Sequence, residues 1–242
     1  MTAARTLRGV WLGRRPYAPV HALQERLRAE RARGEIPDTV LFLEHTPVVT
    51  LGRGADPSNV LLSEEALSLR GFDVEKTDRG GDVTLHAPGQ LVAYPIIDLN
   101  PDRRDVRRYV RGLAETMRRV AFRHGIAAGE APGMIGLWVD RAAPRAWPGP
   151  DHARDLAKLG AIGVRISQWI TMHGFALNLT TEVDLFQLIV PCGIQKYGVT
   201  SLAELGVPGL VMKREADAAY GALADVFGFE RAALDDQSNL EL

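Results

Sequence analysis

Cysteine and lysine are scarce in this sequence. Cys192 is the only cysteine in 242 residues, so no disulfide can form within the chain and nothing points to an oxidising compartment. Arginine is common, but lysine occurs only at Lys76, Lys158, Lys196 and Lys213. Among these, Lys158 is informative because it opens a stretch, 158–166, that is otherwise almost wholly apolar.

Long apolar runs and an excess of either charge are also missing. No run is long enough to span a bilayer, and residues 1–10 lack the apolar core of a signal peptide. The 29 Lys+Arg and 30 Asp+Glu residues leave a net charge of −1, which gives no electrostatic case for nucleic acid or an anionic membrane as a partner. We expect a cytoplasmic protein that folds as one domain over residues 1–242.

Motifs for metals and nucleotides are absent from the sequence. His86, His173 and Cys192 could in principle supply three zinc ligands, but there is no His-Glu-x-x-His and no cysteine pair. The glycines at 80–81 and 160–163 match neither the P-loop nor the dinucleotide fingerprint. We therefore expect no metal and no cofactor.

Hydrophobic periodicity predicts a mixed fold. Apolar residues on one face indicate helices, and short apolar runs bounded by turn residues indicate strands. The predicted helices are 17–33, a short one starting at Ser63, 105–124, a short one after a turn at 199–202, and 213–227. The predicted strands are 6–12, 39–43, 48–51, 72–77, 134–139 and the pair 158–166 and 169–179, with a hairpin or bent strand over 78–90. Clustered strands separated by a few helices favour an α+β fold with a largely antiparallel sheet. Glycines inside the paired strands indicate close approach of a ligand or another backbone.

Cys192 can be interpreted in two ways. It lies between Pro191 and Gly193, after an apolar run, and a lone cysteine in that setting is more often a small buried hydrophobe. A catalytic thiol needs a group that takes its proton, and a lysine buried at a cleft can do so. Lys158 fits that role, although a lysine at a strand edge could equally extend into water.

Three histidines stand next to predicted strands. His86 and His173 are each flanked by glycine or proline, and either could donate a hydrogen bond to an oxyanion or orient a substrate. A lone histidine is more often a structural group, and both interpretations stay open for these two. We interpret His45, which follows Glu44, as structural.

Five segments together resemble one protein family. They are 44–53 (Glu-His-Thr-Pro-Val-Val-Thr-Leu-Gly-Arg), 79–90 (Arg-Gly-Gly-Asp-Val-Thr-Leu-His-Ala-Pro-Gly-Gln), 158–163, 173–178 (His-Gly-Phe-Ala-Leu-Asn) and 191–193 (Pro-Cys-Gly). They fall in the family's order between about residues 39 and 202. The family is octanoyltransferase, or lipoate–protein ligase B, of the biotin/lipoate protein ligase catalytic-domain superfamily.

The resemblance implies both a fold and an activity. The fold is a mixed sheet flanked by helices. The family moves an octanoyl group from acyl carrier protein to one lysine of a lipoyl domain in 2-oxoacid dehydrogenase complexes or in the glycine cleavage H protein. Matched by motif, Cys192 would be the nucleophile that forms an acyl-thioester, and Lys158 its general base. We expect a monomer that needs no cofactor.

The same comparison implies which residues line the acyl pocket. They belong to three of the segments and are Arg79, Gly80, Gly81, Asp82, Val83, Thr84, Leu85 and His86, then Ala161, Ile162 and Gly163, and finally His173, Gly174, Phe175 and Ala176. Ala87 departs from the pattern, because the family usually has glycine there, and its methyl group could narrow the pocket or shift the turn.

Two other functions compete with octanoyl transfer. An ATP-dependent lipoate or biotin ligase of the same fold would activate a free acid and would need no cysteine. A member without catalysis would only bind lipoyl domains or acyl groups, and it would need neither Lys158 nor Cys192.

Overall fold

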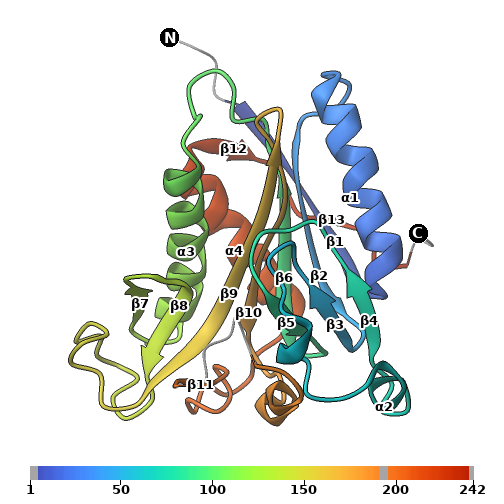
Figure 1. Cartoon of the computed structure of the whole chain (residues 1–242). Coiled ribbons are helices and arrows are strands. Elements are labelled where there is room, and N and C mark those ends of the chain that lie inside the picture. Colours follow the sequence, from blue (N-terminus) through green and yellow to red (C-terminus); the bar gives the residue numbers. More distant parts are fainter. Residues whose placement is uncertain (1–4, 191–195, 240–242) are drawn as a thin grey trace.

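A large, strongly twisted sheet forms the centre of the molecule, with helices on both of its faces (Figure 1). The computed structural model describes residues 5–190 and 196–239. In spatial order the main strands are β12 (Phe229–Arg231), β1 (Arg5–Arg15), β2 (Asp38–His45), β6 (Gln90–Ile96), β10 (Ile170–Asn178), β9 (Leu156–Ser167), β8 (Met134–Asp140) and β7 (Ala128–Ala131). Two short strands join them, β11 (Gly198–Val199) beside β9 and β13 (Asp235–Asp236) beside β1.

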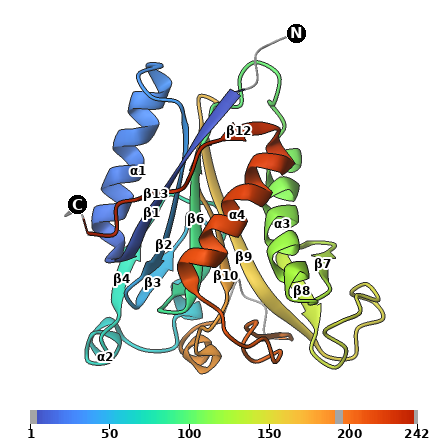
Figure 2. The ribbon, with the colours of Figure 1, turned by 180° about the vertical axis from the view of Figure 1, so that it is seen from behind.

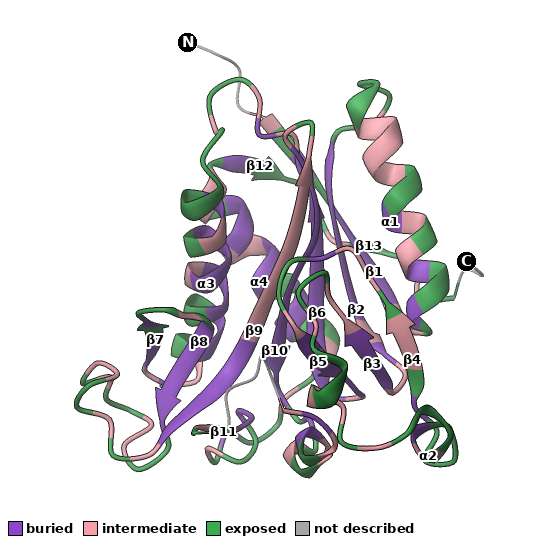
Figure 3. Ribbon diagram, viewed as in Figure 1, coloured by how far each residue is buried: buried purple, intermediate pink, exposed green. Residues whose placement is uncertain are grey.

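The pairing confirms the expected fold class. β2, β6, β10, β9, β8 and β7 pair antiparallel in turn, whereas β1 runs parallel to its neighbours. Strands β6 and β10 are buried along their whole lengths, since elements cover both faces of the sheet there (Figure 3). The fold is thus α+β with a mixed, largely antiparallel sheet.

Helices α3 (Val106–Arg123) and α4 (Met212–Phe227) pack side by side on one face of the sheet (Figure 2). The stripe of α3 that includes Tyr109, Leu113 and Met117 is buried in the larger core. Asp105 caps its first turn by accepting a hydrogen bond from the Arg108 amide, and Gly125 follows its end with φ +73°. The predicted helices 105–124 and 213–227 are confirmed.

Helix α1 (Tyr17–Ala32) covers the opposite face and buries Val20 against the second core cluster. The short helix α2 (Glu64–Ser68) is capped by Ser63, as the sequence predicts. Short 3-10 helices lie at Pro57–Asn59 and Val183–Leu188. No helix in the described ranges is long and apolar enough to cross a membrane.

The hairpin predicted over residues 78–90 does not form, because the strand in this segment belongs to a second, smaller sheet. Strands β4 (Asp73–Lys76), β3 (Val48–Leu51) and β5 (Val83–His86) form it in that spatial order. β5 pairs with β3, while β6 belongs to the large sheet, so β5 and β6 are not a hairpin. The chain crosses from one sheet to the other at Gly89, whose φ is +85° and where an added Cβ would lie 2.7 Å from Thr180.

The predicted helix after residues 199–202 is also wrong. Gly198 and Val199 form β11, which pairs with β9, and turns then lead on to α4. Three short strands, β7, β12 and β13, escaped prediction because such brief segments carry no clear period.

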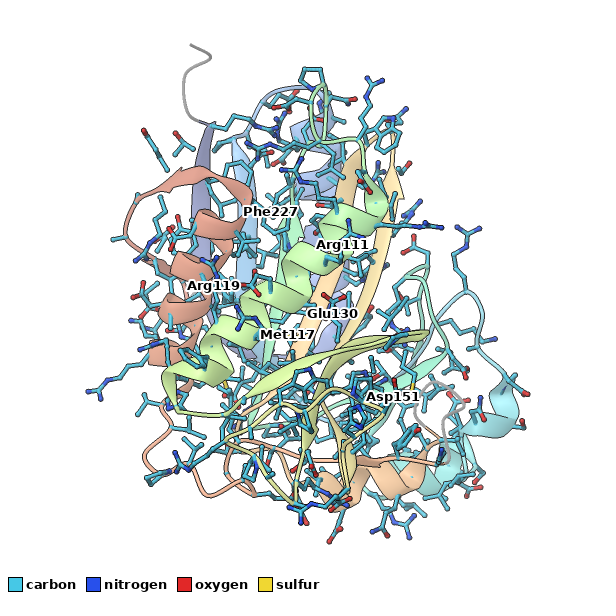
Figure 4. All side chains as sticks on the ribbon, turned by 90° about the vertical axis from the view of Figure 1, so that its left-hand side faces the viewer. Arg111, Met117, Arg119, Glu130, Asp151 and Phe227 are labelled. Atoms are coloured by element: carbon cyan, nitrogen blue, oxygen red, sulfur yellow. The ribbon has the colours of Figure 1, made fainter. Side chains whose placement is uncertain are left out.

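Helices α3 and α4 touch most closely at Gly112, one of two glycines inside them. A Cβ added to Gly112 would lie 2.4 Å from the Phe227 ring. Figure 4, which labels Phe227 and Met117, looks onto this side of α3. A Cβ added to Gly221 of α4 would meet only the far end of the Arg231 side chain, at 3.2 Å.

This contrast predicts opposite effects for two Gly→Ala changes in helices. Gly112→Ala should lower the free energy of unfolding by about 1–3 kcal/mol through overpacking. Gly221→Ala should raise it by about 0.5–1 kcal/mol, because the flexible arginine can move and alanine favours the helix. Urea unfolding of both variants checks this, and Phe227→Ala added to Gly112→Ala should remove most of the overpacking. Equal changes in the free energy of unfolding for Gly112→Ala and Gly221→Ala would contradict the close contact of Gly112 with Phe227.

Candidate active site

A narrow cavity lies between β5 and the paired strands β9 and β10. Helix α1 and strand β6 close its sides. Its lining residues are Tyr17, Arg79, Gly81, Thr84, His86, Tyr94, Ala161, Ile162, Gly163, His173, Gly174, Phe175 and Ala176. Most of the residues that the family resemblance assigns to the acyl pocket therefore line one cavity, although they come from three separate segments of the chain.

Glycine at the strand positions lets other backbone segments come close. Gly163 and Gly174 are partners across β9 and β10. A Cβ on Gly163 would lie 3.1 Å from the Gly80 carbonyl oxygen, and one on Gly174 would lie 2.2 Å from the Ala93 carbonyl oxygen. The interior glycines thus mark the close approach of another backbone, as the sequence predicts.

The segment 79–82 is fixed over the cavity by the end of β3. The amides of Gly52, Arg53 and Gly54 donate to the carbonyls of Asp82, Arg79 and Gly81, respectively, at 3.0–3.1 Å. This clasp leaves no room for a side chain at Gly52, where a Cβ would lie 2.4 Å from the Gly81 oxygen.

Arg79 is buried, and its guanidinium is held from the same side. It donates to the carbonyl and hydroxyl oxygens of Thr50, at 2.7 and 2.9 Å. A buried guanidinium needs such acceptors, so Thr50 explains how Arg79 can border an otherwise largely apolar cavity.

Some of the predicted pocket residues do not line the cavity. Side chains alternate along β5, so Thr84 and His86 face the cavity while Val83 and Leu85 pack in the small core under the second sheet. The Asp82 carboxylate instead accepts hydrogen bonds from the Asp56 amide and the Asn59 side chain. Gly80 takes part through its backbone, which donates to the Val164 carbonyl at 2.9 Å.

Ala87 fits without strain. It is fully buried in the small core and is not among the described residues with positive φ. Its methyl group packs beneath β5, so it neither narrows the cavity nor shifts the turn.

Lys158 lies in a second, smaller cavity and is only 7% exposed. Thr84, Gln90, Lys158, Gly160, Ala161, Asn178, Phe186 and Val199 line this cavity. Thr84 and Ala161 border both cavities, so the cavity of Lys158 adjoins the larger one. Lys158 Nζ is 5.0 Å from the centroid of the Trp138 ring. Because β9 is an interior strand, the alternative of an edge lysine that extends into water is wrong.

Cys192 lies outside the described residues, but the chain on both sides of it is placed. Before it, the Leu61 amide donates to the Leu188 carbonyl and the Val190 amide to the Asn59 carbonyl. After it, Val199 pairs directly with Lys158. Phe186 and Val199, one on each side of Cys192 in sequence, line the cavity of Lys158.

A row of buried hydrogen bonds connects His86 to the strand of Lys158. His86 Nδ1 lies 2.6 Å from Gln90 Oε1, and the side-chain Nε2 of Gln90 donates to Asn178 Oδ1 at 2.9 Å. Asn178 in turn donates to the Thr200 carbonyl, and the Thr200 amide donates to the carbonyl of Lys158.

Four residues of the site were not predicted from the sequence. Gln90 and Asn178 carried a usable signal, because each is a polar residue at one end of a largely apolar strand. They are also direct partners across β6 and β10. Tyr17 and Tyr94 carried none, since one begins a helix and the other lies in a strand that is buried throughout.

Three buried histidines, His45, His86 and His173, lie next to the rings of Tyr17 and Tyr94 beside the cavity. Burial lowers the pKa of His45 to about 4, of His86 to about 3 and of His173 to about 4. His45 is structural, as predicted, because its ring nitrogens lie 3.0 Å from the Arg15 carbonyl and 2.8 Å from the Tyr94 hydroxyl. All three imidazoles are therefore neutral near neutral pH.

One group in the described part of the chain has the composition of a metal site. Ligand atoms of His21, Asp78 and His173 lie within 4.8 Å of one another. However, His173 Nε2 is 2.9 Å from the Asp78 carboxylate, and the Arg165 guanidinium pairs with the same carboxylate. Although burial opposes ionisation of Asp78, these partners hold its pKa below the ordinary value. The arginine already supplies the charge that a cation would bring.

The neutral histidines predict a loss of stability in acid. The unfolded chain binds protons at these positions below about pH 6.5, whereas the folded protein does not until about pH 4. The free energy of unfolding should therefore fall over this range by up to about 1.4 kcal/mol per pH unit for each histidine. Urea unfolding at several pH values measures it. In His45→Gln the free energy of unfolding should fall less in acid than in the wild type, whereas in the exposed control His152→Gln it should fall as much. An equal fall in His45→Gln and the wild type would show that His45 is not held neutral by burial.

Comparison with known proteins identifies the family to which the chain belongs. The family model for the lipoyl protein ligase A/B catalytic domain matches residues 16–223. The chain also shares its fold with a bipartite lipoate protein ligase from Thermoplasma acidophilum, at a TM-score of 0.71 and 13% identity over 96% of this chain and 87% of that one. A lipoate-protein ligase A bound with ATP gives a TM-score of 0.69 and 13% identity over 95% and 89%. These two similarities show a shared fold.

Sequence relatives are more specific. The octanoyltransferase of Chloroflexus aurantiacus is 45% identical over 93% of this chain and 96% of its own length. That of Myxococcus xanthus is 46% identical over 91% of this chain, which spans 59% of that relative's length. The chain therefore belongs to the octanoyltransferase family, a family of acyltransferases built on the lipoyl protein ligase A/B catalytic domain.

Proposed function

We propose that this protein transfers an octanoyl group from octanoyl-acyl carrier protein to a lysine of a lipoyl domain, through a thioester on Cys192. The acceptors would be the lipoyl domains of 2-oxoacid dehydrogenase E2 subunits and the glycine cleavage H protein. The main support is that the two cavities are adjacent, because the buried Lys158 lines the smaller one and Thr84 and Ala161 border both.

The first half-reaction moves the acyl group onto the enzyme. The amine of Lys158 takes the proton of the Cys192 thiol, and the thiolate attacks the carbonyl carbon of the donor thioester. The bond to the carrier sulfur breaks, and the leaving thiolate takes the proton from the Lys158 ammonium. One thioester replaces another, so the acyl group stays activated.

The second half-reaction forms the amide. The acceptor lysine amine attacks the carbonyl carbon of the Cys192 thioester, and Lys158 takes a proton from the attacking nitrogen. The C–S bond breaks as the amide forms, and the proton returns from Lys158 to the Cys192 sulfur. Trp138 stabilises the ammonium that Lys158 becomes in each half-reaction.

The octanoyl chain would occupy the larger cavity. Its apolar and glycine walls come from 161–163 and 174–176, and Thr84, His86 and Tyr94 face it from the other side. We further propose that the protein acts as a monomer of a single domain in the cytoplasm, without a cofactor.

Intact-protein mass spectrometry tests the thioester. After mixing with octanoyl-acyl carrier protein, the wild type should gain one octanoyl group and Cys192→Ala none. Lys158→Ala should gain it at least tenfold more slowly near pH 7, because an unassisted thiol ionises only near pH 8.5. Raising the pH toward 9 should restore much of the rate.

The control is Lys213→Ala, which removes an exposed lysine paired with Asp236 and should react like the wild type. An octanoyl adduct on Cys192→Ala would exclude the proposed nucleophile. If no protein gains the group, the same assay with free octanoate and ATP tests an ATP-dependent ligase instead.

A further inference from the structure

A polar cluster lies at the end of the cavity that is farther from Lys158, and one of its residues, His173, lines the cavity. It consists of Asp78, His173, Arg165 and His21, and we call it the Asp78 cluster. We propose that the Asp78 cluster closes this end of the cavity and limits the length of the acyl chain that the enzyme accepts. The proposal rests on the proposed function, since it concerns the same substrate.

The order of residues along β9 indicates the direction in which the acyl chain runs through the cavity. Lys158 lies in the smaller cavity, Ala161 borders both cavities and Gly163 borders the larger one. Side chains alternate along a strand, so Arg165 points to the same side as Ala161 and Gly163. With its carbonyl near Lys158, an acyl chain in the larger cavity points its methyl end toward Arg165, about 13 Å beyond Ala161 along the strand.

Contacts around Asp78 fix this end of the cavity. Its carboxylate is bound by the Arg165 guanidinium from β9 and by His173 from β10. Two residues further on, the Gly80 amide donates to the Val164 carbonyl. The segment that covers the cavity is therefore tied to both strands at this end of the cavity.

His173 is held in a backbone conformation that few residues adopt. Its φ is +58°, in the left-handed region, although it stands inside a strand. Helix α1 stabilises this conformation, because the side-chain oxygen of the buried Gln24 accepts a hydrogen bond from the His173 amide at 3.0 Å. Such strain persists where surrounding contacts enforce it, and here its result is an imidazole that lines the cavity and binds Asp78.

The Asp78 cluster separates the cavity from water. The His173 side chain is 1% exposed, whereas those of Asp78, Arg165 and His21 are 33%, 28% and 24% exposed. His21 stacks on His173, with ring centroids 5.5 Å apart, and so covers it on the outside. A chain much longer than octanoyl would have to displace an ion pair to continue.

A substitution that removes a side chain of the Asp78 cluster should change which lengths of acyl chain the enzyme accepts. Each further methylene that leaves water strengthens binding about fourfold, so a longer chain gains affinity once it has room. Arg165→Ala should therefore raise the ratio of tetradecanoyl to octanoyl transfer at least tenfold over that of the wild type. His173→Asn, whose side chain tolerates the left-handed conformation, should raise the ratio in the same direction.

The transfer assay uses the full-length protein with acyl carrier protein that carries saturated acyl groups of eight to fourteen carbons. Arg165→Lys should keep the wild-type ratio, since it keeps a charge beside Asp78. Arg118→Ala, which removes an arginine paired with Glu115 on α3, should also leave the ratio unchanged. An Arg165→Ala enzyme that transfers octanoyl and still rejects tetradecanoyl as the wild type does would overturn the proposal.

A binding assay separates this proposal from the proposed function. Native mass spectrometry of the wild type and Arg165→Ala with octanoate or tetradecanoate needs no transfer. A selective gain of tetradecanoate binding in Arg165→Ala supports the cluster as the limit on length, even if neither protein transfers an acyl group. The same binding profile in both proteins refutes it, even if octanoyl transfer is established.

Discussion

The close backbone packing of segment 79–82 between two sheets is the constraint on which the site depends. The segment is bound by the amides of 52–54 on one side and approaches β9 at Gly163 on the other. A Cβ at Gly52 would lie 2.4 Å from the Gly81 oxygen, so glycine is a steric requirement there, whereas a Cβ at Gly163 would require segment 79–82 to shift by a few tenths of an ångström. Where glycines line the cavity its wall is backbone, so its width there is set by the spacing of the strands and the segment rather than by rotamers.

Polar side chains near this cavity are tolerated because they satisfy one another. His86 pairs with Gln90, Gln90 with Asn178, and His45 with Tyr94, so burial leaves these imidazoles neutral rather than charged and unpaired. A saturated chain beside these imidazoles therefore meets neutral, hydrogen-bonded groups. The ionised pair, Arg165 with Asp78, is confined to the rim, where water still reaches it.

Sequence periodicity and glycine placement sufficed for much of the fold and for most of the cavity. Helix α3 was predictable because its apolar stripe and Gly125 are local signals. The passage from β5 to β6 was not, because Ala87-Pro88-Gly89 is equally suited to a hairpin, and only the contact of Gly89 with Thr180 decides. Val83 and Leu85 were assigned to the pocket by motif, yet strand alternation at β5 turns them away from it.

The position of Lys158 shows what local sequence cannot supply. Its apolar neighbours predict burial but not the identity of the surrounding surfaces. On one side of β9, Gly160 admits Met117 of α3, since a Cβ there would lie 2.6 Å from the Met117 sulfur. On the other side Thr84 and Val199 approach from segments far along the chain. The lysine is held between these layers, so its proton chemistry depends on the tertiary packing of the whole sheet.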